Sequence, residues 1–219
     1  MAAIALGLLA VAAGAQTWTF DGGAEGWQVN DLGADWVTSF GVTQPVWSPS
    51  GGAPGGFVSA QDPSSTTFVF EKLALGDYST FVGGKLGFAL QCTANSWGGD
   101  NVVVFRGGAA DQILVTQIGA LPATTWTDYS LDLTADKFRY GSRDGGVVNG
   151  ADFASVMGNL TAVRISAEYG ASTPGIPDTF ETTGLDRVSF TAIPEPATSA
   201  AMLGLVALGG AAWMRRRRG

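Results

Sequence analysis

The sequence has no histidine and a single cysteine, Cys92, and these two features exclude much enzyme chemistry. A Ser-His-Asp triad and a Cys-His dyad both need histidine, zinc sites are built mainly from His and Cys, and one cysteine forms no internal disulfide. Charge is scarce too, at 14% of the 219 residues against about 25% in an average chain. With 12 Lys+Arg and 19 Asp+Glu the net charge is −7, which disfavours nucleic acid as a partner.

Long apolar segments lie only at the two ends of the chain. Residues 2–15 are all small or apolar and finish in Ala13-Gly14-Ala15, the A-x-A pattern that precedes signal-peptidase cleavage. The segment is too short for an ordinary membrane span. We therefore expect a signal peptide over residues 1–15, cleaved by signal peptidase before Gln16, with a buried N-terminal helix as the alternative.

The second apolar segment lies at the C-terminus. The motif Pro194-Glu195-Pro196 precedes 18 uncharged residues, 197–214, which are followed by Arg215, Arg216, Arg217 and Arg218. As a helix these 18 residues would be about 27 Å long, close to the thickness of the membrane hydrocarbon. The arginines would stay on the cytoplasmic side. We expect a single transmembrane helix here.

This order of motif, apolar span and arginine cluster, residues 194–219, resembles the PEP-CTERM sorting signal of exported bacterial proteins. The resemblance implies that an exosortase recognises Pro194, Glu195 and Pro196 and processes the protein there. It also implies a Gram-negative bacterium, an inner-membrane intermediate, and a final place at the cell surface or in the extracellular polysaccharide of a biofilm. A plain membrane anchor is the alternative interpretation.

Residues 16–193 are expected to form one acidic domain. Without the four terminal arginines and Glu195, eight basic and 18 acidic residues are left, a net charge of −10. Short apolar or alternating runs between Gly, Pro, Asp, Asn and Ser clusters predict β-strands, and strands at this spacing favour an antiparallel sandwich or jelly roll. The expected strands lie near residues 17–20, 57–60, 67–71, 85–91, 101–106, 112–117, 126–133, 162–169 and 185–190.

Two local patterns sharpen this prediction. In residues 126–133, Trp126 falls on the same side as Asp128, Ser130 and Asp132, because side chains alternate along a strand. In residues 150–158 we expect one short helix, capped by Asn149 with Asp152 as the returning carboxylate. Its apolar face would consist of Phe153, Val156, Met157 and Leu160.

A family resemblance extends over most of this domain, from about residue 17 to 190. It rests on the order and spacing of six short elements rather than on one strong motif. They are Phe20-Asp21 with Glu25-Gly26-Trp27, Pro45-Val46-Trp47-Ser48, Leu75-Gly76-Asp77-Tyr78, residues 83–88, residues 152–165 and residues 185–190. Together they resemble the laminin IV type A domain, also called laminin B. The resemblance implies an all-β jelly-roll sandwich similar to galactose-binding and carbohydrate-binding modules.

The resemblance also suggests a structural calcium ion. In jelly-roll sandwiches of this kind the two ends of the domain lie side by side, and a calcium ion often connects them. Asp21, Glu25 and Asp186 would supply carboxylates to a cation that prefers oxygen ligands. In the alternative, Asp21 opens a turn and Asp186 accepts hydrogen bonds from backbone amides.

Tryptophans are the best candidates for ligand contact, because their faces stack on sugar rings. Trp97 lies in a polar, glycine-rich loop and Trp36 follows Asp35 in another expected loop, so we take both as candidate glycan-binding residues. In the alternative, these loops fold back onto the sandwich. The expected core contains Cys92 and three other tryptophans, Trp27, Trp47 and Trp126.

The sequence therefore favours an exported, non-enzymatic matrix protein with a structural or adhesive role. A specific carbohydrate-binding module is the first alternative. A glycoside hydrolase is the second, because 18 acidic residues include many carboxylate pairs. The expected partners are signal peptidase and exosortase during export, the membrane before processing, and matrix glycans afterwards, but not nucleic acid.

Overall fold

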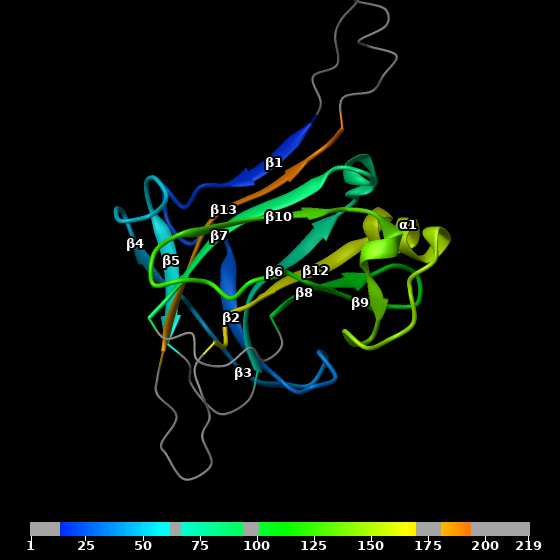
Figure 1. Cartoon of the computed structure of the whole chain (residues 1–219), viewed down its shortest axis with the longest axis horizontal. Helices are drawn as coiled ribbons and strands as arrows, with labels where there is room; N and C mark the ends of the chain where they lie inside the picture. Colours follow the sequence, from blue (N-terminus) through cyan, green and yellow to red (C-terminus); the bar gives the residue numbers. More distant parts are fainter. Residues whose placement is uncertain (1–13, 62–66, 94–100, 170–180, 194–219) are drawn as a thin grey trace, which may run out of the picture.

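A computed structural model describes residues 14–61, 67–93, 101–169 and 181–193, which form two packed antiparallel sheets (Figure 1). The six-stranded sheet has the order β10 (Thr127–Asp132), β7 (Lys85–Cys92), β13 (Thr182–Thr191), β5 (Phe57–Gln61) and β4 (Val46–Ser48), with β1 (Ala15–Trp18) also paired to β13. The seven-stranded sheet has the order β11 (Arg139–Tyr140), β9 (Gln112–Gln117), β8 (Val102–Gly107), β12 (Leu160–Ser166), β6 (Thr67–Gly76), β2 (Trp27–Leu32) and β3 (Ser39–Thr43). The all-β sandwich expected from the sequence is confirmed.

All nine expected strands are present, with ends shifted by a few residues, and the sequence missed β2, β3, β4 and β11. The one expected α-helix is α1 (Gly150–Gly158), and two short 3-10 helices, η1 (Ser79–Phe81) and η2 (Ala135–Lys137), accompany it. The Asn149 side chain accepts a hydrogen bond from the Asp152 backbone N–H at 2.9 Å. The Asp152 carboxylate in turn accepts a hydrogen bond from the side-chain amide of Asn149 at 2.9 Å. The predicted cap and helix are therefore confirmed, but Leu160, expected on the apolar face of the helix, is the first residue of β12.

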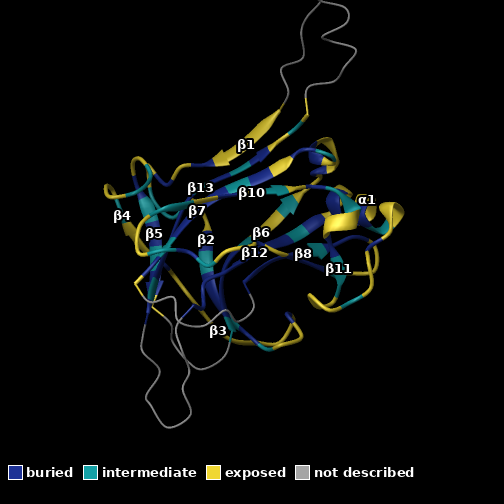
Figure 2. Ribbon diagram, in the orientation of Figure 1, coloured by how far each residue is buried: buried dark blue, intermediate teal, exposed yellow. Residues whose placement is uncertain are grey.

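The buried parts of the strands lie where the two sheets face each other (Figure 2). The core there is rich in aromatic side chains. Phe190 on β13 is fully buried, and its ring lies 6.1 Å from that of Phe105 on β8, so these side chains connect the inner faces of the two sheets. Trp27 and Cys92 are buried, as expected. A smaller apolar cluster, which contains Trp36, Val69 and Val104, lies apart from this core.

The first and last strands of the domain run side by side (Figure 1). Ala15 pairs with Thr191, and Trp18 pairs with Val188. Along β13, residues 182–185 pair with β5, whereas residues 188–191 pair with β1. The register against β7 shifts between Asp186 and Ser189, at the point where β13 changes partner. The expectation that the two ends of the domain meet is confirmed.

The expected membrane segment falls outside the described part of the chain, as do residues 1–13 of the expected signal peptide. The same holds for Pro194, Glu195, Pro196 and the arginines 215–218. Within residues 14–61, 67–93, 101–169 and 181–193, no helix is long and apolar enough to cross a membrane.

One side of the sandwich is formed by the edge strands β3 and β4, which follow one another in the chain. All five residues of β3 are exposed, Phe40 by 62%. Trp47 on β4 is 39% exposed, and its indole N–H donates to the Phe20 carbonyl at 2.6 Å. The expectation that Trp47 belongs to the core is wrong, because a strand at the sheet edge has no neighbour on one side to cover its side chains.

Candidate functional site

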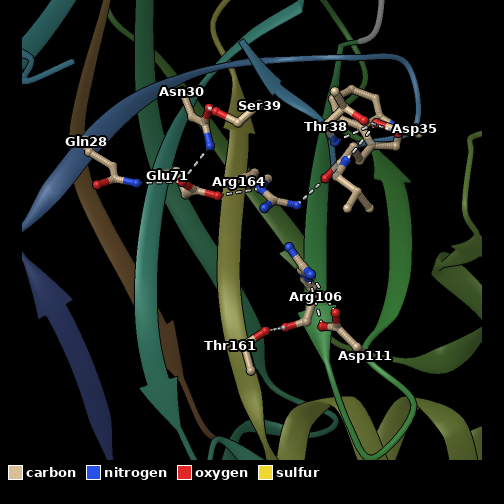
Figure 3. Close-up of polar contacts among 12 residues, drawn as sticks. Gln28, Asn30, Asp35, Thr38, Ser39, Glu71, Arg106, Asp111, Thr161 and Arg164 are labelled. Atoms are coloured by element: carbon tan, nitrogen blue, oxygen red, sulfur yellow. Dashed lines mark hydrogen bonds and ion pairs between the residues drawn. The ribbon is translucent and has the colours of Figure 1, made fainter. Parts of the chain in front are cut away.

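A buried ion pair lies on the outer face of the seven-stranded sheet (Figure 3). The Arg164 Nε on β12 donates to Glu71 Oε1 on β6 at 2.7 Å, and both side chains are almost fully buried. The other Glu71 oxygen, Oε2, accepts hydrogen bonds from Gln28 at 2.7 Å and Asn30 at 3.0 Å. Burying charge is tolerable only when it is paired and hydrogen-bonded, and this network satisfies that condition.

The same arginine holds the loop that contains Trp36. Arg164 Nη1 donates to the Trp36 carbonyl at 2.5 Å. Asp35 accepts from the backbone N–H and the side-chain hydroxyl of Thr38. These hydrogen bonds lower the pKa of Asp35 to about 2, and the bond from the Thr38 hydroxyl contributes most. The Trp36 ring is 3% exposed and packs in the small apolar cluster on this sheet face. Trp36 is therefore not available for stacking on a glycan, and the alternative, a loop folded back onto the sandwich, is correct.

Beside this pair is an open cleft of about 290 Å³, lined by Leu73, Arg106, Asp111, Thr161, Ala162 and Arg164. Asp111 accepts two hydrogen bonds from Arg106, one from Nε at 2.8 Å and one from Nη2 at 2.5 Å. The guanidinium lowers the pKa of the Asp111 carboxyl. This carboxylate is thus ionised, and both of its oxygens already accept hydrogen bonds from the Arg106 guanidinium. A general acid must carry a proton that it can donate, so Asp111 is unsuited to that role.

A groove of different character lies on the outer face of the six-stranded sheet, and we call it the Trp126 groove. Its volume is about 290 Å³, and its lining is apolar and neutral polar: Phe57, Ser59, Gln91, Cys92, Thr93, Thr124, Thr182 and Gly184. The Trp126 ring is partly exposed beside it, with its centroid 5.4 Å from that of Phe57 in an edge-on contact. The indole N–H donates to the Gly51 carbonyl at 2.8 Å. The ring is thereby held in place.

Gly184 on β13 makes room for this ring. A β-carbon at this position would lie 3.0 Å from the tip of the Trp126 indole and 3.1 Å from Gln91 Cγ. A side chain at 184 would therefore displace the ring or the amide. By register, Gly184 is opposite Gln91 on one side and Ser59 on the other. Aromatic, amide and hydroxyl groups thus share one row on the same face of the sheet.

The expectation that Trp126 belongs to the core is wrong, because its side chain is partly exposed. The sequence pattern predicts the correct position, because alternation along the strand puts Trp126 on the same side as Asp128, Ser130 and Asp132. All three of these residues are exposed. The buried side of the strand includes Tyr129 and Leu133. The other expected glycan-binding residue, Trp97, lies outside the described residues.

Of the carboxylates proposed for calcium, Asp186 lies at the bulge of β13, and the charge of Asp21 acts on both Asp186 and Glu25. The Asp186 carboxylate is fully buried and accepts from the Ala53 backbone N–H at 2.5 Å and from that of Arg187 at 2.6 Å. Burial raises its pKa, and the nearby charge of Asp21 adds to this effect. Burial also raises the pKa of Glu25, again with a contribution from Asp21. The backbone amides bound by Asp186 fit the alternative to calcium.

Within the described ranges, no group of three or more His, Cys, Asp and Glu side chains is placed to hold a metal ion. A calcium ion at Asp21 and Asp186 would need backbone carbonyls to complete six to eight oxygen ligands. The calcium site stays a prediction. A bound ion would raise the melting temperature in millimolar calcium relative to chelator, and Asp21→Asn would abolish that rise. Equal midpoints in the two solutions would contradict it.

The comparison with protein families agrees with this architecture. The laminin B (domain IV) family matches residues 68–196, more than half of the chain, and a PEP-CTERM protein-sorting motif matches residues 192–218. The chain therefore belongs to the laminin B (domain IV) family and ends in a PEP-CTERM sorting motif. No curated protein matches it.

Solved structures share the fold at low sequence identity. The L4b domain of human laminin alpha-2 is 17% identical, with a TM-score of 0.63 over 83% of this chain and 98% of that domain. The family 11 carbohydrate-binding module of the cellulase Lic26A-Cel5E from Clostridium thermocellum is 12% identical, with a TM-score of 0.52 over 84% of this chain and 98% of the module. Another structure of a family 11 module from this organism contains a β-1,3-1,4-mixed-linked tetrasaccharide. That module is 10% identical, with a TM-score of 0.52 over 84% of this chain and 99% of the module.

Proposed function

We propose that this protein is an exported, non-enzymatic component of the extracellular polysaccharide matrix that binds glycan through the Trp126 groove. The PEP-CTERM motif and the laminin B domain indicate an exported, cell-surface protein. We further propose that signal peptidase and exosortase process the chain in a Gram-negative bacterium, with a membrane-anchored intermediate.

The observation behind the glycan-binding proposal is the make-up of the Trp126 groove. A partly exposed indole ring beside neutral hydrogen-bonding groups suits a sugar ring, which has apolar faces and a polar rim. Gln91, Ser59 and Thr182 supply such groups along the groove. Because Trp126 is fixed by Gly51 and Phe57, little conformational freedom would be lost on binding.

The linings of the Trp126 groove and of the cleft beside Arg164 favour binding over hydrolysis. A glycosidase needs a carboxylic acid of raised pKa that faces a second carboxylate across the substrate. The Trp126 groove has no carboxylate in its described lining, and the cleft beside Arg164 has only the ionised Asp111. The raised pKa values of Glu25 and Asp186 belong to carboxyls that line neither. These features support a non-enzymatic role.

A structural role without a specific glycan is the second candidate, and the edge strand β3 favours it. Residues 36–48 contain no charged residue, and Phe40 and Val42 are exposed. An exposed, uncharged edge strand is a template for pairing with another chain. Concentration-dependent self-association in the absence of glycan binding would favour this candidate.

The test of glycan binding is the substitution Trp126→Ala in the purified full chain. The probe is soluble, neutral mixed-linkage β-glucan, and affinity is measured by titration calorimetry. Loss of a central aromatic contact costs about 2 kcal/mol, or roughly 30-fold in affinity. The matched control is Trp47→Ala, which removes a partly exposed tryptophan from the edge of the same sheet and should leave affinity unchanged. Equal affinity of Trp126→Ala and the unchanged chain would contradict the proposal.

A further inference from the structure

Basic residues gather at one place in this acidic domain. Of the eight Lys and Arg residues between positions 16 and 193, three line a single cleft of about 310 Å³ on the seven-stranded sheet: Lys137, Arg139 and Arg143. The rest of its lining is Val115, Thr116, Gln117 and Asp136. The lining therefore has three positive charges and one negative charge, in a domain with a net charge of −10.

The register of the sheet places Arg139 on its outer face. Arg139 on β11 is opposite Val115 on β9, and Val115 is opposite Val104 on β8. Val104 is in turn opposite Arg164 on β12, whose side chain lies on the outer face. Directly paired residues of antiparallel strands point to the same face. The basic cleft is therefore on the opposite side of the sandwich from the Trp126 groove.

Arg139 is oriented before any ligand arrives. Its Nη1 donates to the carbonyls of Asp136 at 2.9 Å and Phe138 at 3.0 Å. Among the described residues, its hydrogen bonds involve Nη1 only. A guanidinium presents five N–H donors in a rigid fork that fits carboxylate or sulfate oxygens, so the Nε and Nη2 groups are suited to such an anion.

Asp136 and Asp144 form only exposed ion pairs with two of the cations of this cleft. Asp136 Oδ2 lies 3.7 Å from Lys137 Nζ, and Asp144 Oδ2 lies 3.5 Å from Arg143 Nε. All four side chains are substantially exposed, and ion pairs of that kind contribute little. An anion that touches the Arg139 fork would add contacts that these aspartates do not make.

We infer that the Lys137–Arg139–Arg143 cleft binds the anionic groups, carboxylates or sulfate esters, of an acidic polysaccharide. The charge of the whole domain favours a polymer with widely spaced charges over a densely charged one such as DNA, because a domain of net charge −10 repels the rest of the polyanion. Gln117 at the cleft offers an amide for neighbouring hydroxyls. The assignment to a polysaccharide rests on the proposed matrix function, whereas the anion site itself does not.

The experiment compares Arg139→Gln with Lys85→Gln in the full chain. Each removes one positive charge, but Lys85 lies on the other sheet, paired with Asp132. The probes are polygalacturonate for carboxylate, dextran of low sulfate content for sulfate ester, neutral dextran and duplex DNA, at low and high salt. We expect binding to at least one acidic polysaccharide that weakens with salt. Arg139→Gln should weaken it about tenfold, the effect of one charge-assisted hydrogen bond, and Lys85→Gln less than twofold.

Several outcomes would overturn the inference: binding of neither acidic polysaccharide, equal loss in the two variants, equal binding of neutral dextran, or tighter binding of DNA than of either polysaccharide. Trp126→Ala separates this result from the proposed function, because it should leave binding of acidic polysaccharide unchanged. If Trp126→Ala has no effect on neutral glucan while Arg139→Gln abolishes polygalacturonate binding, the Trp126 groove proposal fails and the basic cleft stands.

Discussion

Replacing Arg164 by alanine is expected to lower the free energy of unfolding by about 3–5 kcal/mol, because it leaves the Glu71 carboxylate buried without its counter-charge. Glu71 is 1% exposed and lies between β2 and β12, so water does not readily replace the guanidinium. The substitution also removes the hydrogen bond that holds the Trp36 carbonyl. Urea unfolding of the full chain measures the change.

Two further variants show whether burial is the cause. The double substitution Glu71→Met with Arg164→Met should cost less than Arg164→Ala, because no unpaired charge is left inside. Lys85→Ala breaks the exposed pair with Asp132 and should cost less than about 1 kcal/mol. A loss below about 1 kcal/mol for Arg164→Ala would mean that water or another cation reaches Glu71.

Phe190→Ala is expected to have an effect of similar size, about 3–5 kcal/mol. The Phe190 ring is fully buried, and its centroid lies 4.9 Å from that of Tyr78, 5.7 Å from Phe81 and 6.1 Å from Phe105. Removing it opens a cavity between the two sheets, and the surrounding aromatic rings can fill it only in part. Urea unfolding again provides the measurement.

The matched control for Phe190 is Phe40→Ala on the exposed edge strand β3. The two substitutions delete the same atoms, but Phe40 is 62% exposed, and surface substitutions usually stay within about 0.5 kcal/mol. Similar losses for the two variants would refute the assignment of Phe190 as the side chain that connects the sheets.

Much of the fold could be predicted because its signals are local. The α1 cap depends on Asn149 and Asp152, three residues apart, and strands such as β9 show apolar runs with clear boundaries. Strand β2 was missed because Asp31 breaks the alternation that Trp27 and Val29 begin. Only the fold reveals that Gln28 and Asn30 donate hydrogen bonds to Glu71. The edge strands β3 and β4 are short and exposed, so burial imposes little pattern on them.

The candidate site was harder to predict because its residues come from distant parts of the chain. Loop position suggested that Trp36 was exposed, but Arg164, 128 positions away, holds that loop against the sheet. Trp126 was assigned to the core because its position resembles a core position of the family, although it lies on the same side of the strand as Asp128 and Asp132. The space for its ring depends on the absence of a side chain at Gly184, and the sequence gives no sign that this glycine lies beside Trp126.

The pairing of β1 with β13 also determines how the domain would respond to mechanical tension. The Trp126 groove includes Thr182 and Gly184 at the start of β13, and the chain leaves toward the sorting motif from the other end of that strand. A pull between a bound glycan and a surface tether would run along this ten-residue strand, which is about 30 Å long. Such a load shears the hydrogen bonds to β7 and β1 together instead of breaking them one by one. Because the hydrogen bonds share the load, this direction of pulling suits the proposed role in the matrix.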